Sequence, residues 1–117
     1  MTKGTEGRAA AEDRIFAVRS ERSDAVEHVR VEGEIDLSVV GELDSEMRRA
    51  EATDAERIEL DLDRLEFLDA SGVRLLLRLY QRSRGDSQRL RIRPASSPQV
   101  RRVLEVTGVG ELLPIEA

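Results

Sequence analysis

The sequence lacks the residues on which many small extracellular or metal-binding domains depend. Its 117 residues include no Cys and no Trp, and aromatic residues make up 3% of the chain. The absence of Cys excludes a disulfide framework and a thiolate metal site, and it fits a reducing compartment. No apolar run approaches the roughly 18 residues that a membrane span needs, and no segment resembles a signal peptide. We therefore expect one cytoplasmic domain, stabilised by its own hydrophobic core.

Charged residues, by contrast, are abundant and unevenly placed. They make up 37% of the chain, and the formal net charge is −5. The segment from Arg74 to Arg102 has nine Arg and a single acidic residue, Asp86. A basic stretch can contact nucleic acid, but the negative net charge and the scarcity of aromatic residues for base stacking argue against that partner. Arg also covers apolar surface with its aliphatic stem, which explains the stretch without a function.

The N-terminal part of the chain predicts a polar extension followed by a hairpin. Residues 1–13 show no hydrophobic period and are expected to form a flexible extension before a domain at 14–117. Two short apolar segments, at 14–19 and 25–32, read as strands joined by a polar turn at 20–24.

Two further strands alternate with three helices in the remaining sequence. The expected elements are a helix capped by Ser38, a strand at 57–63, a helix that opens at 69–72 and ends at Gly85, a strand at 89–93, and a helix from Ser97 to Gly108. This succession implies parallel strands with right-handed crossovers. The acids at 59, 61 and 63 are then expected beside the arginines at 89, 91 and 93. The pattern predicts an α/β fold in which helices cover mainly one face of a small mixed sheet.

The turn Asp69-Ala70-Ser71-Gly72 is the first candidate site. Ser71 is expected to be the N-cap of the following helix, with its hydroxyl accepting a backbone N–H. A phosphate on that hydroxyl would meet free amides and the positive end of the helix dipole. It would add a charge of about −1.5 to −2 beside Asp69, enough to repel a docked partner. Asp36 precedes the first helix in the same way, and both turns follow strands at the edge where open α/β sheets place their sites.

Catalysis is weakly supported by the sequence. His28, the only His, lies in mid-strand far from any nucleophile. The chain has no Gly-rich phosphate loop and no spaced set of His and carboxylate ligands. We therefore expect no enzymatic activity, no cofactor and no metal.

Three segments together resemble the STAS domain. They are Gly-Glu-Ile-Asp-Leu at 33–37, the alternating strand at 57–63 and Phe-Leu-Asp-Ala-Ser-Gly-Val at 67–73. From about Arg14 to the C-terminus the chain is most similar to stand-alone bacterial anti-sigma factor antagonists. The resemblance implies the STAS fold, with a mixed sheet of four to five strands, and a partner-switching role. In that family an unphosphorylated antagonist binds an anti-sigma factor, often a serine kinase, and so frees a sigma factor for transcription.

One position departs from the family pattern. The phosphorylated hydroxyl of the family directly follows the motif Asp, and here that position is Ala70, which has no hydroxyl. Three outcomes stay open: Ser71 is phosphorylated instead, the protein is a constitutively active antagonist, or it is regulated only by binding. An engineered Ser-to-Ala change is a further explanation.

Our leading hypothesis is an antagonist that binds its anti-sigma factor around the start of the helix that follows residue 69. The partner-binding residues are expected to be Asp36, Ser38, Asp69, Ala70, Ser71, Gly72 and Val73. An alternative is a structural STAS-type subunit of a lipid-transport or stress-signalling complex. A weak homodimer is compatible with either hypothesis.

Overall fold

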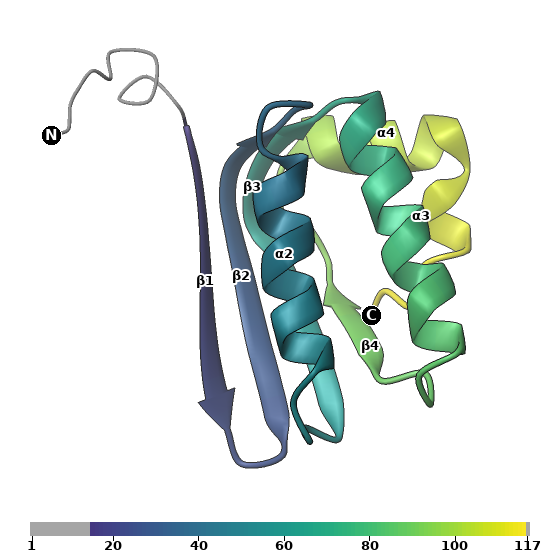
Figure 1. The fold of residues 1–117 in the computed structure, drawn as a ribbon. Coiled ribbons are helices and arrows are strands. Elements are labelled where there is room, and N and C mark those ends of the chain that lie inside the picture. The colour runs from purple at the N-terminus through teal and green to yellow at the C-terminus, as the bar shows by residue number, and fades with distance from the viewer. Residues whose placement is uncertain (1–14, 117) are drawn as a thin grey trace, which may run out of the picture.

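The computed structural model describes residues 15–116, which form a mixed sheet with helices packed against it (Figure 1). The N-terminal extension predicted at 1–13 lies outside the described residues. In chain order the elements are β1 (Phe16–Ser23), β2 (Val26–Ile35), α2 (Val40–Glu51), β3 (Arg57–Leu68), α3 (Ala70–Arg84), β4 (Leu90–Arg93), α4 (Pro98–Thr107) and the 3₁₀ turn η1 (Val109–Glu111). Within residues 15–116, no helix is both long enough and apolar enough to cross a bilayer.

The sheet confirms the predicted hairpin and parallel crossovers. Its strand order is β1-β2-β3-β4, with β1 antiparallel to β2 and the other two pairs parallel. The hairpin turn is shorter than predicted, because β1 continues through Ser23 and only Asp24 and Ala25 connect the strands. Asp24 adopts a φ of 52°, a left-handed conformation that Asp tolerates better than most residues. The polar residues at 20–23 therefore belong to an edge strand rather than to a loop.

β3 is longer than the predicted strand at 57–63. It runs to Leu68, but the register between β2 and β3 shifts between Arg30 and Glu32 and again between Gly33 and Glu34. These irregularities break the strict alternation while both Leu65 and Leu68 stay buried. The alternating pattern in the sequence ends at residue 63 for this reason, although the strand continues.

Gly33 allows the start of β1 to approach β2 closely. Its φ is 90°, and a Cβ atom at this position would lie 2.0 Å from the carbonyl oxygen of Ile15. That same oxygen accepts a hydrogen bond from the amide of Glu34 at 2.6 Å. Only Gly fits both the left-handed backbone and this contact.

The core lies between the sheet and the helices on one face. α2 and α3 run side by side across that face (Figure 1), as the apolar stripes of the sequence predict. Fully buried side chains come from both helices and from the apolar side of β3: Leu43, Met47, Leu75, Leu76, Leu79, Ile58, Leu60 and Leu62. The helix-covered face is thus mainly apolar, with the buried Glu27 paired to Arg49 of α2 as a charged exception.

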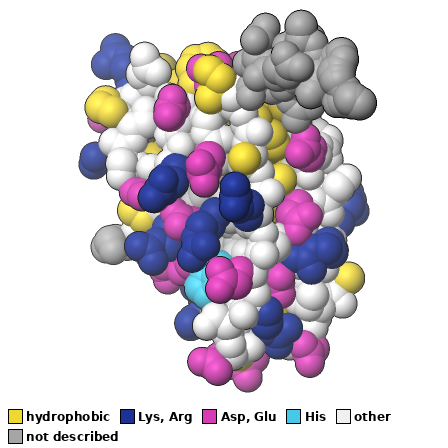
Figure 2. All heavy atoms as spheres, turned by 90° about the vertical axis from the view of Figure 1, so that its left-hand side faces the viewer, with side chains coloured by type: hydrophobic (Ala, Val, Ile, Leu, Met, Phe, Trp, Pro, Cys, Tyr) yellow, Lys and Arg dark blue, Asp and Glu magenta, His cyan; other side chains and the backbone are white. Residues whose placement is uncertain are grey.

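The opposite face of the sheet carries charged side chains of both signs. Glu59 lies opposite Arg91 in the register of β3 and β4, as predicted. Its carboxylate contacts β2, however, because Oε1 of Glu59 lies 2.8 Å from Nδ1 of His28. Acidic and basic side chains also alternate over the side of the molecule that bears β1 (Figure 2). The expected row of ion pairs between β3 and β4 is not seen among residues 15–116, because Glu59 and Asp61 contact His28 and Arg30 of β2 instead.

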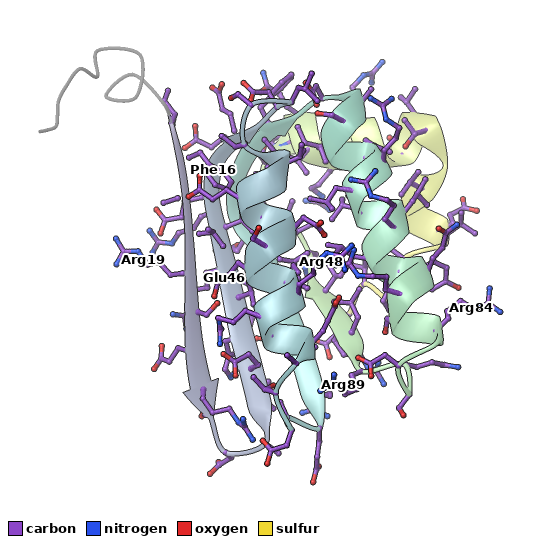
Figure 3. All side chains as sticks on the ribbon, in the orientation of Figure 1. Phe16, Arg19, Glu46, Arg48, Arg84 and Arg89 are labelled. Atoms are coloured by element: carbon purple, nitrogen blue, oxygen red, sulfur yellow. The ribbon has the colours of Figure 1, made fainter. Side chains whose placement is uncertain are left out.

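Arg89 departs from the predicted row of arginines and instead supports α2. Its guanidinium donates to the backbone carbonyls of Glu51 at 2.6 Å, Ala55 at 2.7 Å and Thr53 at 3.2 Å. The side chain lies beside the C-terminal end of α2 (Figure 3). A positive charge at this position also interacts favourably with the helix dipole.

The C-terminal segment covers the outer edge of β4. The amide of Ile92 donates to the carbonyl of Pro114 at 2.9 Å, and the amide of Glu116 donates to the carbonyl of Ile92 at 2.8 Å. Ile115 forms an isolated parallel bridge with Ile92 through these bonds. The C-terminal segment therefore packs back on the domain.

Candidate functional site

Two loops meet at the edge where β2 and β3 end. Ile35 and Leu68 are register partners at the ends of these parallel strands, so the next residues of each strand, Asp36 and Asp69, begin neighbouring loops. The amide of Asp69 donates to the carbonyl of Ile35 at 3.1 Å. The structure thus brings together the two segments that the sequence singled out.

Asp69, not Ser71, is the N-cap of α3. One carboxylate oxygen, Oδ1, accepts from the amide of Ser71 at 2.9 Å and from the amide of Gly72 at 3.2 Å. The Ser71 hydroxyl donates to the same oxygen instead of accepting a backbone N–H. The predicted cap is therefore wrong by two residues, since the free amides bond to the carboxylate of Asp69 and not to the hydroxyl of Ser71.

The environment of Asp69 keeps its carboxyl group ionised. Burial disfavours the charged form, but the hydrogen bonds from Ser71 and Gly72 outweigh it and lower the pKa of Asp69. The positive charge of Arg74, one turn into α3, contributes in the same direction. The negative charge lies at the positive end of the helix dipole. Since Oδ1 is already occupied by donors of its own chain, the arrangement is that of a structural cap rather than of a general base.

The first loop repeats this arrangement outside a helix. Oδ1 of Asp36 accepts from the amide of Ser38 at 2.9 Å and from its hydroxyl at 2.6 Å. The sequence predicts Ser38 as the N-cap of α2, and this prediction is wrong. The cap position is Val39, which has no side-chain hydrogen bond, and the helix begins at Val40. In both loops an Asp followed two residues later by Ser closes a tight turn.

The predicted site residues differ in exposure. Asp36, Ser38 and Ala70 are exposed, and Asp69 is partly exposed. Ser71, Gly72 and Val73 are buried. A Cβ atom at Gly72 would lie 3.1 Å from the side chains of both Ile35 and Leu68, so the start of α3 packs tightly against the strand ends. The surface of the site is therefore smaller than the predicted set of residues.

Two apolar residues at this edge were not among the predicted site residues. Leu37 is 74% exposed between Asp36 and Ser38, and Phe67 is 40% exposed near the end of β3. Both were assigned to apolar motifs, where burial is the usual expectation. The available signal was their position, since Leu37 lies two residues after the end of β2 and Phe67 lies one residue before the end of β3. We define the loop edge as the exposed surface of Asp36, Leu37, Ser38, Asp69 and Ala70.

The other residues considered for a chemical role do not lie at the loop edge. His28 lies in mid-strand and pairs with Glu59, as described above. Among residues 15–116, no group of three His, Asp or Glu side chains could hold a metal ion. The loop edge therefore offers exposed apolar side chains and a capped helix start, which suit contact with another protein.

A family model described as "Mlab, STAS domain" matches residues 18–114. The chain therefore belongs to the STAS domain family, and the predicted fold and family are confirmed. No curated protein matches the sequence.

Solved structures with the same fold include several anti-sigma factor antagonists. The antagonist from Mycobacterium paratuberculosis superposes with a TM-score of 0.75 at 26% identity, covering 86% of this chain and 84% of that one. SpoIIAA in its unphosphorylated form has a TM-score of 0.64 at 27% identity, covering 86% and 89%. The Bacillus cell fate determinant SpoIIAA in its phosphorylated form has a TM-score of 0.62 at 25% identity, covering 86% and 92%.

Proposed function

We propose that this chain is an anti-sigma factor antagonist that binds an anti-sigma factor through the loop edge and thereby releases a sigma factor. It acts in the cytoplasm by binding and not by catalysis. The observation that carries the proposal is the exposed pair Leu37 and Ala70 on neighbouring loops of a fold shared with anti-sigma factor antagonists. A partner that covers this pair would bury apolar surface next to a pre-ordered helix start.

The buried residues of the predicted set hold the exposed residues of the loop edge in position. Ser71 holds the carboxylate of Asp69 in place, while Gly72 and Val73 pack α3 against the strand ends. Because the turn is closed by hydrogen bonds within the chain, little conformational entropy is lost when a partner docks. These residues position the surface, and Asp36, Leu37, Ser38, Asp69 and Ala70 contact the partner.

We further propose that this antagonist works without a phosphate switch at the position that the family uses. One of the similar structures is a phosphorylated SpoIIAA, and by the resemblance the acceptor position here is Ala70. Ser71 is 7% exposed, and its hydroxyl is engaged by Asp69. A kinase would have to open the first turn of α3 to reach that hydroxyl. Among the three open outcomes, the geometry favours an antagonist that is always competent to bind.

The test begins with identification of the partner by pull-down from the native host. A small kinase-like anti-sigma factor supports the proposal, whereas a transporter ATPase or a large stress-signalling assembly supports the alternative of a structural subunit. The identified protein is then titrated with the wild type and with Ala70→Asp, which places a charge on the loop edge. We expect the dissociation constant to rise at least about tenfold, since an unpaired charge is costly inside an interface.

The matched control is Ala52→Asp. Ala52 is also exposed, but it lies at the C-terminal end of α2, away from the loop edge. This variant makes the same chemical change and should leave the affinity within about twofold of the wild type. Equal affinities for all three proteins would remove the loop edge as the binding surface.

Phosphorylation of Ser71 is tested by intact-mass spectrometry after incubation with the partner and ATP. The wild type and Ser71→Ala are compared. We expect no added phosphate on either protein. A phosphate on the wild type that is missing from Ser71→Ala would show that the switch has moved by one residue.

A further inference from the structure

Within residues 15–116, one edge of the sheet is covered and the other is left open. At β4 the outer edge is covered, because Ile92 exchanges hydrogen bonds with the C-terminal segment. Among the described strands the sheet ends at β1, which pairs with β2 alone. β1 is eight residues long and contains no Pro and no register shift against β2. Such an edge presents a row of backbone groups that another strand can pair with.

The register of the hairpin determines which backbone groups of β1 point outward. The two-residue turn and the bond from Glu34 N to Ile15 O place the odd-numbered residues of β1 in hydrogen bonds with β2. The even-numbered residues therefore direct their N–H and C=O groups away from the sheet: Phe16, Val18, Ser20 and Arg22. A second strand must bond to this set.

Charge on β1 is also left without a partner. Arg19 lies opposite Arg30 in the hairpin, a like-charge pair, and Arg30 contacts the carboxylate of Glu21 at 3.4 Å instead. Among residues 15–116 no ion pair of Arg19 is found, and its side chain points out past β1, away from the sheet (Figure 3). An acidic group beyond the edge would neutralise it.

A second copy of β1 supplies an acidic group opposite Arg19 in only one register of pairing. Antiparallel pairing of two outward sets allows a two-fold axis at any residue of β1. An axis at Val18 sets Arg19 against Ala17, and an axis at Arg22 sets Arg22 against itself. An axis at Arg19 or Glu21 sets that residue against itself, so like charges meet. An axis at Ser20 places Arg19 of each copy opposite Glu21 of the other, in a pair without direct backbone bonds, where side chains lie closest. The outward backbone groups of β1 and the charges of Arg19 and Glu21 thus agree on a single self-complementary arrangement.

We propose that the chain forms a symmetric homodimer by antiparallel pairing of its β1 edges around Ser20. The two sheets join into one continuous sheet through hydrogen bonds between the outward groups of β1. Because the contact is one strand wide, we expect a weak dimer with a dissociation constant between about 10 µM and 1 mM. In Figure 1, β1 forms one edge of the sheet and α3 begins on the far side of α2 from it, so the pairing edge and the start of α3 are separate surfaces.

The test is sedimentation equilibrium of the full chain over a concentration range up to about 1 mM. Arg19→Glu and Glu21→Arg each replace two attractive pairs with two repulsive ones, so each should raise the dissociation constant at least about tenfold. The double swap Arg19→Glu with Glu21→Arg restores opposite charges in the same register, and it should return the dissociation constant to within a few-fold of the wild type. Both residues are exposed, and circular dichroism checks that each variant is folded.

Arg93→Glu is the matched control, because Arg93 is an exposed Arg on β4, at the other side of the sheet. It should leave the dimer unchanged. A wild type that stays monomeric over the whole concentration range would overturn the proposal. The charges of β1 would then serve to protect a free sheet edge from pairing. A dimer that resists both single variants, or that the double swap fails to restore, would also overturn it, since another surface or register would then hold the copies together.

Discussion

Replacing Asp69 with Ala is the sharpest test of how the first turn of α3 is held. The variant loses the cap, which accepts two backbone amides, and such a loss costs about 0.5–2 kcal/mol. It also leaves the hydroxyl of Ser71, a residue 7% exposed, without its acceptor. An unsatisfied buried donor costs about 1–3 kcal/mol. We therefore expect Asp69→Ala to lower the free energy of unfolding by about 1.5–5 kcal/mol.

The two parts of this cost are separated by a double-mutant cycle with Ser71→Ala. That variant removes one hydrogen bond but leaves the cap and both amide bonds, so it should cost about 1 kcal/mol. In the Ser71→Ala background, Asp69→Ala no longer leaves a buried hydroxyl donor without its acceptor. The double variant should therefore be more stable, by about 1 kcal/mol, than the sum of the single effects predicts.

Urea unfolding at pH 7, followed by far-ultraviolet circular dichroism, measures these differences. The slope of the free energy against urea concentration should not change between variants. Asp36→Ala is the matched control, since Asp36 also accepts an amide and a hydroxyl, but in an exposed loop outside any helix. Its cost should stay below about 1 kcal/mol. If Ser71→Ala costs as much as Asp69→Ala, the assignment of Asp69 as the cap is refuted, whereas additive effects would refute the coupling between the two side chains.

The stabilisation by Asp69 should also depend on pH in a defined direction. The pKa of its carboxyl group in the folded protein lies below the ordinary value of 3.8. The stabilisation is therefore fully present above that ordinary value and is lost as the pH falls through the lowered folded pKa. The difference in unfolding free energy between wild type and Asp69→Ala should be constant from pH 7 to about pH 5 and shrink in stronger acid. A difference that grows on acidification would contradict this sign.

Two other substitutions test how the edges of the fold are held. Gly33→Ala places a methyl group against the carbonyl of Ile15 in a left-handed backbone, and it should cost about 3 kcal/mol or more in urea unfolding. Its control, Gly41→Ala, meets open space in α2 and should be neutral or stabilising by up to about 1 kcal/mol, so equal costs would refute the contact. Arg89→Met removes the charged donor at the end of α2 and should lower the unfolding free energy by about 2–3 kcal/mol. The exposed Arg93→Met should change it by less than about 0.5 kcal/mol, and a similar effect of both would contradict the proposed support of α2.

The fold could be predicted because its signals are local. The alternation of Ile58, Leu60 and Leu62 with acidic residues defines a strand with one buried face, and the structure buries these three side chains. The cap of α4 is equally local, since Ser97 accepts the amide of Val100 in the first turn of that helix, as predicted. Strand ends were less predictable because register shifts and pairing with a neighbour extend a strand beyond its alternating part.

The structure places the two predicted loops side by side, but it shows that the helix caps were assigned wrongly. Both Ser38 and Ser71 were expected to cap helices, and in both cases the Asp two residues earlier holds the turn. The Asp-x-Ser spacing contains two competing acceptors, and local propensity ranks them nearly equal. Tertiary geometry decides between them, because the bond from Asp69 N to Ile35 O sets where the chain turns into α3.

The sequence by itself determined the order of elements, the apolar faces that they bury and the STAS resemblance, because each depends on side-chain periods and motifs within short segments. Only the tertiary structure decided which side chains at the loop edge face solvent and which backbone groups of β1 face outward. Exposure at the end of a strand depends on the neighbouring strand and on the helix packed above it, and no local pattern encodes either. For that reason Ala70 and Leu37 emerged as surface and Ser71 as interior only once the sheet was assembled.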